Sequence, residues 1–267
     1  MDRPGRQAGV QTVHKAIAIL RLFLETDGNG MAAKDFASKC RFPRSTAYRL
    51  LSALRAEGLI DEAPGGGRYY PGPLLYELGL LAYPRLGIRE SCNDIVQRTA
   101  RMAGATCFLT LRSGLDGLCV DRSEVDSTLN ARDVDIGTRR PLGIGLGSIA
   151  ILSALSFDEA ERIMKANSER YAQSSRFGIS HVKSMVARTR RRGYAYTSND
   201  YIDDIGGFAV AVGPLAGGLG NAAISVAARV EAMPLSRAPE ILPLLSAASE
   251  ELRARLGFAE PACVVPA

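Results

Sequence analysis

Apolar residues recur at helical spacing along the first quarter of the chain and indicate three short helices. Ala16, Ile17 and Leu20 lie three to four residues apart, which places them on one face of a helix. Pro43 suits the first position of the third helix because its missing N–H has no partner there, and Gly58 provides a left-handed end. The expected helices span Val13–Leu24, Ala32–Lys39 and Pro43–Glu57, with a tight turn over Cys40–Phe42.

Two short extended segments follow, Leu59–Glu62 and Arg68–Tyr70, on either side of a turn over Pro64–Gly67. This pattern predicts a β-hairpin. Three helices and a hairpin within about 60 residues are typical of a winged helix-turn-helix. Leucines at 74, 75, 78 and 81 then predict a linker helix.

The remaining two thirds of the chain alternate between strand-like and helical patterns. An amphipathic helix is expected over Leu86–Met102, a glycine-rich segment leads into a helix over Gly143–Leu155, and Ser180 is expected to cap a helix ending before Gly193. Further helices are expected over Phe157–Glu169 and Ala238–Leu256. The expected strands are Thr106–Arg112, Gly117–Arg122, Asp126–Ile136, Tyr194–Thr197, Gly207–Gly213 and Ala222–Arg229.

Segregated strands and helices favour an α+β fold for this second part. The chain is therefore expected to contain a winged helix-turn-helix over residues 1–72, a linker helix over 73–86 and an α+β domain over 87–267. Its 267 residues also exceed the usual size of one domain, roughly 100–200 residues.

Composition narrows the classes of function. The net charge of +5 and the pI of about 9.0 suit a polyanionic partner. No apolar run reaches the roughly 20 residues of a membrane helix, and the polar start is not a signal peptide, so a cytoplasmic protein with no membrane partner is expected. Five scattered cysteines without a C-x-x-C pair predict neither disulfides nor structural zinc.

The third helix carries the candidate nucleic-acid chemistry. One face is apolar, and the other presents donors and one flat aromatic ring, which suit phosphates and base edges in a major groove. The expected DNA-binding residues are Lys34, Arg41, Arg44, Ser45, Thr46, Tyr48, Arg49, Ser52 and Arg68. An ordinary solvated basic helix is the alternative, which the ordered series of helices, turn and hairpin disfavours.

These segments resemble the DNA-binding domain of the IclR family of regulators. The resemblance rests on Ala16–Leu20, Phe42–Leu51, Gly58–Ile60 and Gly67–Pro73, above all on the pattern Pro-x-Ser-Thr-x-x-Arg-Leu-Leu. The family usually has glycine where Arg41 stands, so the turn is expected to differ here, because a left-handed arginine costs ~1 kcal/mol.

The resemblance continues, more loosely, to about Leu256. Its markers are Gly137–Leu142, the glycine-rich segment to Leu152, Arg190–Ala195 and Ala223–Val226. It implies a GAF-like antiparallel-sheet domain that binds a small-molecule effector, often an organic or aromatic acid, and that joins subunits into homodimers or homotetramers. The effector-binding residues that it implies are Leu146, Gly147, Thr197, Gly207, Ser225 and Ala227.

Two of these positions are unusually small, Gly207 and Ala227, which favours a roomy pocket and an aromatic or larger acid. Arg122 is a candidate anchor for a carboxylate, with a solvated strand-end arginine as the alternative. Ser148, Ser198 and Asn199 are nearby candidate hydrogen-bond donors.

Two other classes of function remain open. Gly145-x-Gly147-x-x-Ala150 fits a loose dinucleotide fingerprint, as in an oxidoreductase, but no βαβ unit is expected around it. A ligand-independent DNA-binding scaffold is the other alternative. With only His14 and His181 to act as histidine bases, both expected at solvated positions, we expect no catalytic residues, no metal site and no cofactor.

The expected mechanism is that of an effector-controlled regulator. Paired subunits present two basic helices to a pseudo-palindromic operator in double-stranded DNA, and the linker helix transmits the state of the effector domain.

Overall fold

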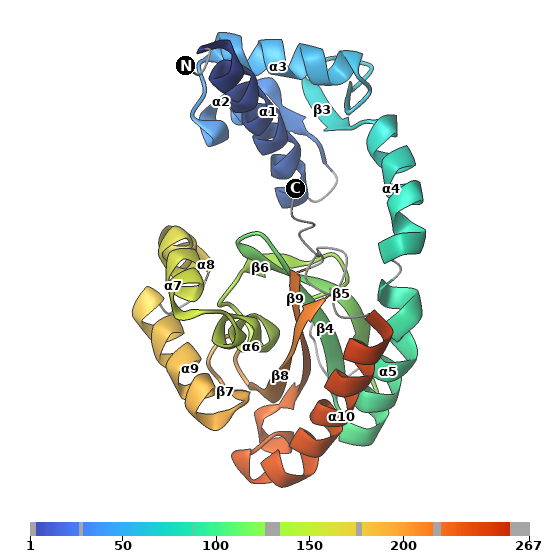
Figure 1. Cartoon of the computed structure of the whole chain (residues 1–267), viewed down its shortest axis with the longest axis vertical. Helices are drawn as coiled ribbons and strands as arrows, with labels where there is room; N and C mark the ends of the chain where they lie inside the picture. Colours follow the sequence, from blue (N-terminus) through green and yellow to red (C-terminus); the bar gives the residue numbers. More distant parts are fainter. Residues whose placement is uncertain are drawn as a thin grey trace, which may run out of the picture. The chain divides into compact units, whose positions relative to one another are not determined.

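The computed structural model describes residues 4–26, 29–86, 88–125, 134–174, 178–215 and 220–256. Within it the chain divides into two compact units, Met1–Gly87 and Ile88–Ala267 (Figure 1). Among the described helices, none combines the length and apolar character that crossing a bilayer requires.

The first unit packs helices around one apolar core and carries a small antiparallel sheet. Ile19, Phe36, Leu51 and Ile60, which come from three helices and a strand, are almost fully buried in this core. The prediction of a winged helix-turn-helix is confirmed. The elements are α1 (Pro4–Leu22), the 3₁₀ turn Phe23–Glu25, β1 (Met31–Ala32), α2 (Ala33–Cys40), α3 (Arg44–Ala56), β2 (Ile60–Glu62), β3 (Arg68–Pro71) and α4 (Pro73–Leu86).

The helix bounds differ from the prediction mainly at the first helix, which begins nine residues earlier, at Pro4, and ends at Leu22. Pro43 precedes α3 as its N-cap instead of being its first residue. Gly58 takes a φ of 70°, and the Leu59 N–H donates to Leu54 O at 2.9 Å, so α3 ends at the predicted left-handed glycine.

The turn between α2 and α3 keeps the left-handed conformation although an arginine occupies it. Arg41 has φ 55° and ψ 41°, and its N–H donates to the carbonyls of Ala37 and Ser38. The expectation that this turn differs is therefore wrong. The packing of α2 on α3 holds the backbone in this left-handed conformation, and the conformational strain of a non-glycine residue there is tolerated.

The second unit is built on a six-stranded antiparallel sheet in the order β6-β5-β4-β9-β8-β7. The predicted α+β class with an antiparallel sheet is confirmed. The strands are β4 (Thr106–Ser113), β5 (Asp116–Ser123), β6 (Arg139–Pro141), β7 (Ala195–Ser198), β8 (Ile205–Leu215) and β9 (Gly220–Arg229). The helices are α5 (Ile88–Ala103), α6 (Leu146–Ala154), α7 (Phe157–Ala166), α8 (Ser168–Ser174), α9 (Ile179–Arg192) and α10 (Ala238–Leu256), with 3₁₀ turns at Val230–Ala232 and Leu235–Arg237.

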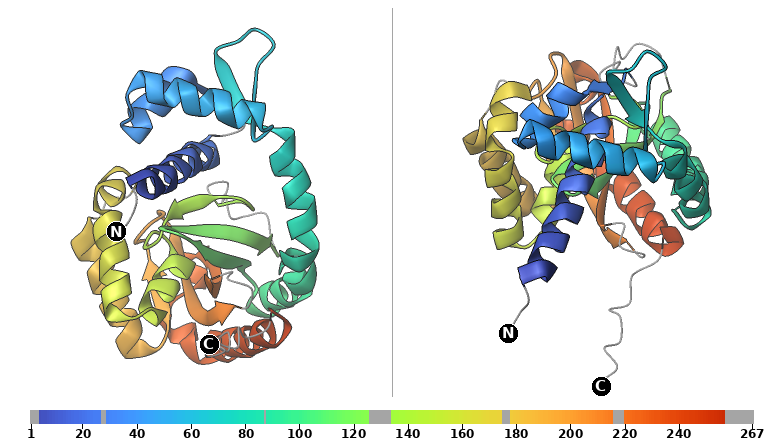
Figure 2. Two further views of the ribbon diagram at one scale, coloured as in Figure 1. Left: turned by 45° about the horizontal axis from the view of Figure 1, so that its top comes forward. Right: turned by 90° about the horizontal axis from the view of Figure 1, so that it is seen from above.

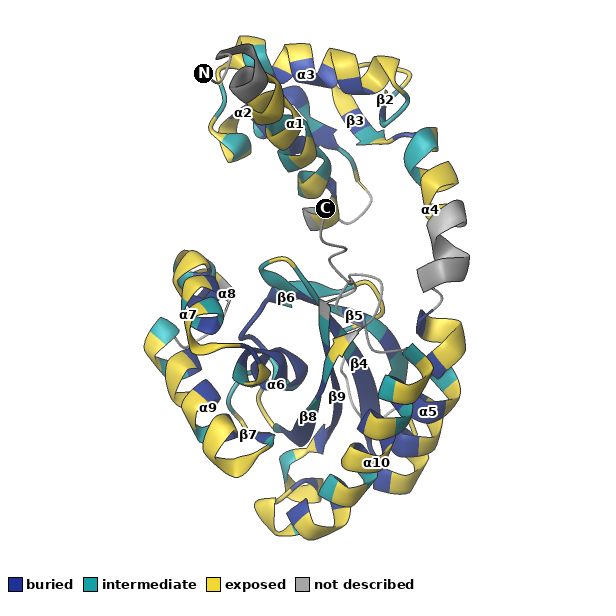
Figure 3. Ribbon diagram, in the orientation of Figure 1, coloured by how far each residue is buried: buried dark blue, intermediate teal, exposed yellow. Residues whose placement is uncertain are grey.

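Helices cover both faces of this sheet (Figures 1 and 2). On one face α5 and α10 lie side by side over a core that includes Ile95, Leu109 and Leu245. On the other face α6 packs against β8 and β9, and α9 packs on α6. The sheet is therefore the buried middle layer, and much of β4, β8 and β9 is dark blue in Figure 3.

Two local predictions for this unit are wrong, and a third falls largely on residues that are not described. Of the strand expected over 126–136, residues 126–133 lie outside the described residues and Val134–Ile136 is not a strand; the described strand that follows is β6. The helix expected over Phe157–Glu169 is divided at Asn167, whose buried amide donates to Leu115 O at 2.7 Å. Gly178, not Ser180, is the N-cap of α9.

The start of α6 lies unusually close to the sheet. A Cβ at Gly147 would come within 2.6 Å of Thr110 Oγ1 and 2.9 Å of Thr110 Cβ. A Cβ at Gly117 would come within 2.3 Å of Ser148 Oγ, and one at Gly207 within 2.8 Å of Leu146 Cδ1. Three glycines from different elements thus allow the first turn of α6 to contact the strands.

A buried carboxylate ties the first turns of α5 to β5. Asp121 is fully buried and accepts hydrogen bonds from Arg89 Nε at 3.3 Å and from Asn93 Nδ2 at 3.0 Å. Leu109 pairs with Asp121 and Thr110 with Cys119, so Val120 is the extra residue of a β-bulge. The bulge turns Asp121 toward α5.

Replacing Arg41 by glycine is expected to raise the free energy of unfolding by about 0.5–1 kcal/mol, because glycine adopts positive φ without steric cost. Urea denaturation of both proteins measures the difference. Arg41→Ala, which removes the charge and keeps a Cβ, is the matched control and is expected to give no comparable gain. Equal stabilisation by alanine and glycine would show that the gain in stability comes from removing the positive charge of Arg41 and not from the backbone freedom of glycine.

Gly147→Ala is expected to lower the free energy of unfolding by about 1–3 kcal/mol through overpacking against Thr110, although alanine favours helices. The same substitution at Gly79 in α4, where nothing lies within 4 Å, is expected to be neutral or stabilising by up to about 1 kcal/mol. Thermal and urea unfolding measure both variants. A neutral Gly147→Ala would show that α6 can move off the sheet without cost.

Candidate functional site

The outer face of α3 is exposed and polar, whereas its inner face is fully packed. Ala47, Leu50, Leu51 and Leu54 are buried against α1 and α2, as the helical spacing predicts. Figure 3 shows the alternation of buried and exposed positions along this helix. The predicted residues on the outer face are Arg44, Ser45, Tyr48, Arg49 and Ser52, all exposed, and Thr46, which is half-buried.

The arginines of this unit differ in what they contact. Among the described residues, no acidic side chain pairs with Arg41, Arg44 or Arg49, and all three are exposed. Arg55, at the other end of α3, pairs with Glu62 on β2 at 2.5 Å between Nη1 and Oε2. Lys34 is exposed on α2. The available positive charge therefore gathers at the start of α3 and the turn before it.

Arg68 has a structural contact that the sequence did not reveal. Its Nη1 donates to Asn29 O at 2.6 Å and to Gly30 O at 3.1 Å, which ties β3 to the segment before β1. Part of its donor capacity is thus used within the unit. The side chain is exposed, so its remaining N–H groups face solvent.

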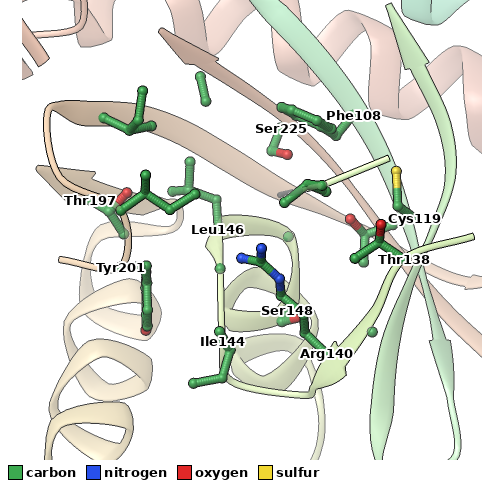
Figure 4. A pocket seen from close by; sticks show the side chains of 18 of the residues that line it. Phe108, Cys119, Thr138, Arg140, Ile144, Leu146, Ser148, Thr197, Tyr201 and Ser225 are labelled. Carbon is green, nitrogen blue, oxygen red and sulfur yellow. The ribbon is translucent and has the colours of Figure 1, made fainter. Parts of the chain in front are cut away.

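The second unit contains a cavity of about 280 Å³ beside the start of α6, which we call the α6 cavity (Figure 4). Strands β4, β5, β8 and β9 and the residues around 140–148 and 197–205 form its walls. The lining residues are Phe108, Thr110, Gly117, Cys119, Val134, Thr138, Arg140, Ile144, Gly145, Leu146, Gly147, Ser148, Thr197, Tyr201, Ile202, Asp203, Asp204, Ile205, Ser225, Ala227 and Arg229.

The structure brings together five of the six expected effector-binding residues in this lining: Leu146, Gly147, Thr197, Ser225 and Ala227. Gly207 is not part of the lining. It lies directly behind Leu146, and a Cβ there would also come within 2.2 Å of Val226 O. Its role in the structure is to leave room for the Leu146 side chain.

Three buried hydroxyl groups belong to the lining. Ser148, Thr197 and Ser225 are 4%, 5% and 3% exposed, and their hydroxyls form no hydrogen bond with another residue in the described part of the chain. Buried polar groups in proteins are nearly always hydrogen-bonded, so hydroxyls that face a cavity favour a polar ligand or water there. Apolar side chains, chiefly Phe108, Leu146 and Ile205, make up much of the rest.

The sequence analysis missed Arg140, whose side chain reaches into the cavity (Figure 4). The candidate anchor Arg122 is instead outside the lining. It pairs with Glu124 and, at 3.8 Å, with Asp135, and its guanidinium lies 5.8 Å from the centre of the Phe108 ring. Of the other candidate donors, Ser148 lines the cavity and Ser198 and Asn199 do not.

The described thiols of the second unit are not suited to nucleophilic chemistry. Burial raises the pKa of Cys119, which lines the cavity, to about 12, and that of Cys92 to about 11. Burial also raises the pKa of Cys107. Thiolates are the reactive form, so these groups act as small core side chains at neutral pH. Cys263 lies outside the described residues.

His14 is exposed as expected, but His181 is only 21% exposed and its expected solvated position is wrong. Its ring packs edge-on against Tyr201, and burial lowers its pKa. Tyr201 lines the cavity, and its hydroxyl donates to Gly143 O at 3.0 Å. This pair helps to hold the glycine-rich segment before α6.

The dinucleotide alternative lacks its structural context. All strand pairs of the sheet are antiparallel, and the segment before Gly145 is an edge strand that pairs with β5. A dinucleotide fingerprint requires a parallel βαβ unit. The glycines at 145 and 147 instead shape the start of α6 against the cavity.

Comparison with known proteins assigns both units. The family model described as the IclR helix-turn-helix domain matches residues 12–64, and the model described as bacterial transcriptional regulator IclR C-terminal matches residues 81–254. The chain is 25% identical over 192 residues to the HTH-type transcriptional regulator XynR of Escherichia coli (strain K12), covering 72% of this chain and 75% of that protein.

Solved structures share the fold. A putative IclR transcriptional regulator from Silicibacter sp. TM1040 aligns with a TM-score of 0.76 and 21% identity over 94% of this chain and 98% of that one. An IclR homolog from Microbacterium hydrocarbonoxydans, complexed with 4-hydroxybenzoate, aligns with a TM-score of 0.63 and 18% identity over 92% and 98%. Because a single family model covers residues 81–254, well over half of the sequence, and a second covers the helix-turn-helix, this chain belongs to the IclR family of DNA-binding transcription regulators, which are not enzymes.

Proposed function

We propose that this regulator binds a pseudo-palindromic operator through α3 as a homo-oligomer, and that an organic or aromatic acid in the α6 cavity controls this binding. The observation that carries the proposal is the cavity itself, which combines apolar walls with three buried hydroxyls that have no protein partner among the described residues.

The exposed donors at the start of α3 support the choice of recognition helix. Arg44 and Arg49 lie on the same outer face as Ser45, Tyr48 and Ser52. Arginine recognises guanine edges bidentately, and hydroxyl groups contact phosphates. Two such helices in a symmetric dimer fit half-sites spaced about one DNA turn apart, roughly 34 Å.

The lining of the α6 cavity supports an acid with an apolar body. Phe108, Leu146 and Ala227 offer apolar contact, while the first-turn N–H groups of α6 and the Ser148 hydroxyl offer donors to an anion. The Microbacterium homolog, which shares this fold, is complexed with 4-hydroxybenzoate, an aromatic acid. A ligand-independent scaffold does not account for a cavity with buried hydroxyl groups.

The tie between β5 and α5 offers a route for the signal. Cys119 forms part of the cavity wall, and Asp121, across the bulge, holds Arg89 and Asn93 in the first turns of α5. In sequence, α5 follows α4 after one residue. In this proposal β5 has two arrangements, and the ligand binds one of them more tightly than the other. Binding then favours that arrangement and, through the contacts of Asp121, the position of α5 and α4 that goes with it.

Arg49→Ala is expected to weaken operator binding about tenfold or more, the effect of removing one arginine contact to a base edge or phosphate. Binding is measured by fluorescence anisotropy with duplexes from upstream of the protein's own gene and neighbouring genes, over a series of salt concentrations. Arg21→Ala is the matched control, because Arg21 is an exposed arginine of the same unit at the end of α1. Equal losses for both variants, or none for Arg49→Ala, would reject α3 as the reading helix.

Ala227→Leu is expected to fill the α6 cavity and abolish the response to effector. A screen of organic and aromatic acids by thermal shift identifies ligands of the wild-type protein, and these are then tested for altered operator retention. The variant is expected to lose the thermal shift and the DNA response while it retains operator binding without ligand. Retention of both responses would place the effector elsewhere.

A further inference from the structure

Arg140 and Arg139 are neighbours on β6 with opposite surroundings. Arg140 pairs with Gly117 of β5 in the sheet register, and Gly117 lines the α6 cavity. Since successive residues of a strand face opposite sides, Arg140 faces the cavity and Arg139 faces away from it. Arg139 accordingly donates to Ser113 Oγ at 2.9 Å and lies 3.4 Å from Asp116 Oδ2.

The other charged residues of the lining lie at the solvent rim. Arg229 and Asp204 are 62% and 56% exposed and approach each other at 3.9 Å, and Asp203 is exposed as well. Arg140 is half-buried. Among the described lining residues it is therefore the charged group that lies deeper in the cavity.

Other donors lie next to Arg140. Gly117, its partner in the register, has no side chain, and the Ser148 hydroxyl occupies the adjoining space, 2.3 Å from where a Gly117 Cβ would be. Ser148 belongs to the first turn of α6, which has no side-chain cap. The guanidinium, a buried hydroxyl and a helix N-terminus thus approach one end of the cavity, while Phe108 and Ala227 belong to the apolar cluster on another wall.

We propose that Arg140 is the residue that selects an anionic effector, by pairing with the carboxylate of an aromatic monocarboxylic acid whose ring lies against Phe108 and Ala227. The proposal rests on the proposed function of the α6 cavity and specifies how that site distinguishes an acid from its neutral analogue. A guanidinium matches the two oxygens of a carboxylate in geometry and charge, whereas a carboxamide offers one acceptor and no charge.

The test uses the full-length protein and three probe pairs: benzoate, phenylacetate and 4-hydroxybenzoate, each with its carboxamide. Binding is measured by isothermal titration calorimetry. The wild-type protein is expected to bind at least one acid about 10- to 100-fold more tightly than the matching amide. Arg140→Met is expected to lower affinity for that acid by the same factor and to leave the amide almost unchanged.

Two further variants test whether a loss of affinity comes from the charge of Arg140, from the planar geometry of its guanidinium or from damage to the fold. Arg140→Lys keeps the charge without the planar fork and is expected to give an intermediate affinity. Arg139→Met removes the neighbouring arginine on the opposite side of the strand, together with its contact to Asp116, and is expected to bind the acid as the wild type does. Circular dichroism and thermal unfolding confirm that each variant is folded.

The proposal is overturned if the wild-type protein binds none of the acids, if acid and amide bind equally, or if Arg140→Met retains wild-type affinity for the acid. These outcomes differ from failure of the proposed function. A neutral ligand that binds in the α6 cavity and changes operator retention would leave effector control intact and reject only the role of Arg140.

Discussion

The second unit depends on the contact between the first turn of α6 and the sheet. This contact requires three positions without side chains, Gly117, Gly147 and Gly207, on three different elements. Because α6 is held against the strands there, its unpaired N–H groups and the Ser148 hydroxyl are directed at the cavity instead of at bulk water. The same close approach therefore builds the fold and creates the ligand site.

A cavity of this kind is suited to binding and not to chemistry. The Cys119 thiol in its wall has a raised pKa, and His181 packs against Tyr201 and is not part of the lining. What remains at the inner end of the cavity are hydroxyls, N–H groups and the Arg140 guanidinium, which orient a ligand without activating it. The three hydroxyls that face the cavity have no protein partner among the described residues, so a ligand that hydrogen-bonds to them stabilises the folded form and yields a thermodynamic signal.

The sequence predicts elements whose signals are local. The spacing in α3, the glycine after it, the hairpin and the bounds of α10 need no distant partner. By contrast, β6 is three residues long and exists because it pairs with β5, so no periodicity indicates it. The pairing of β6 with β5 is what assigns Arg139 and Arg140 to opposite faces of the sheet, and the sequence alone does not reveal that pairing. Arg140 was missed and Arg122 favoured for this reason.

The arginines show why net charge is a weak guide to function. Contacts to a carboxylate or a backbone carbonyl of their own unit are made by Arg55, Arg68, Arg122, Arg139 and Arg190. Such residues add to the charge of +5 but stabilise the fold. Function is better indicated by arginines whose guanidinium groups face solvent on the outer face of α3 or face the α6 cavity. The structure separates the arginines that stabilise the fold from those that indicate function, because it shows which groups each guanidinium contacts.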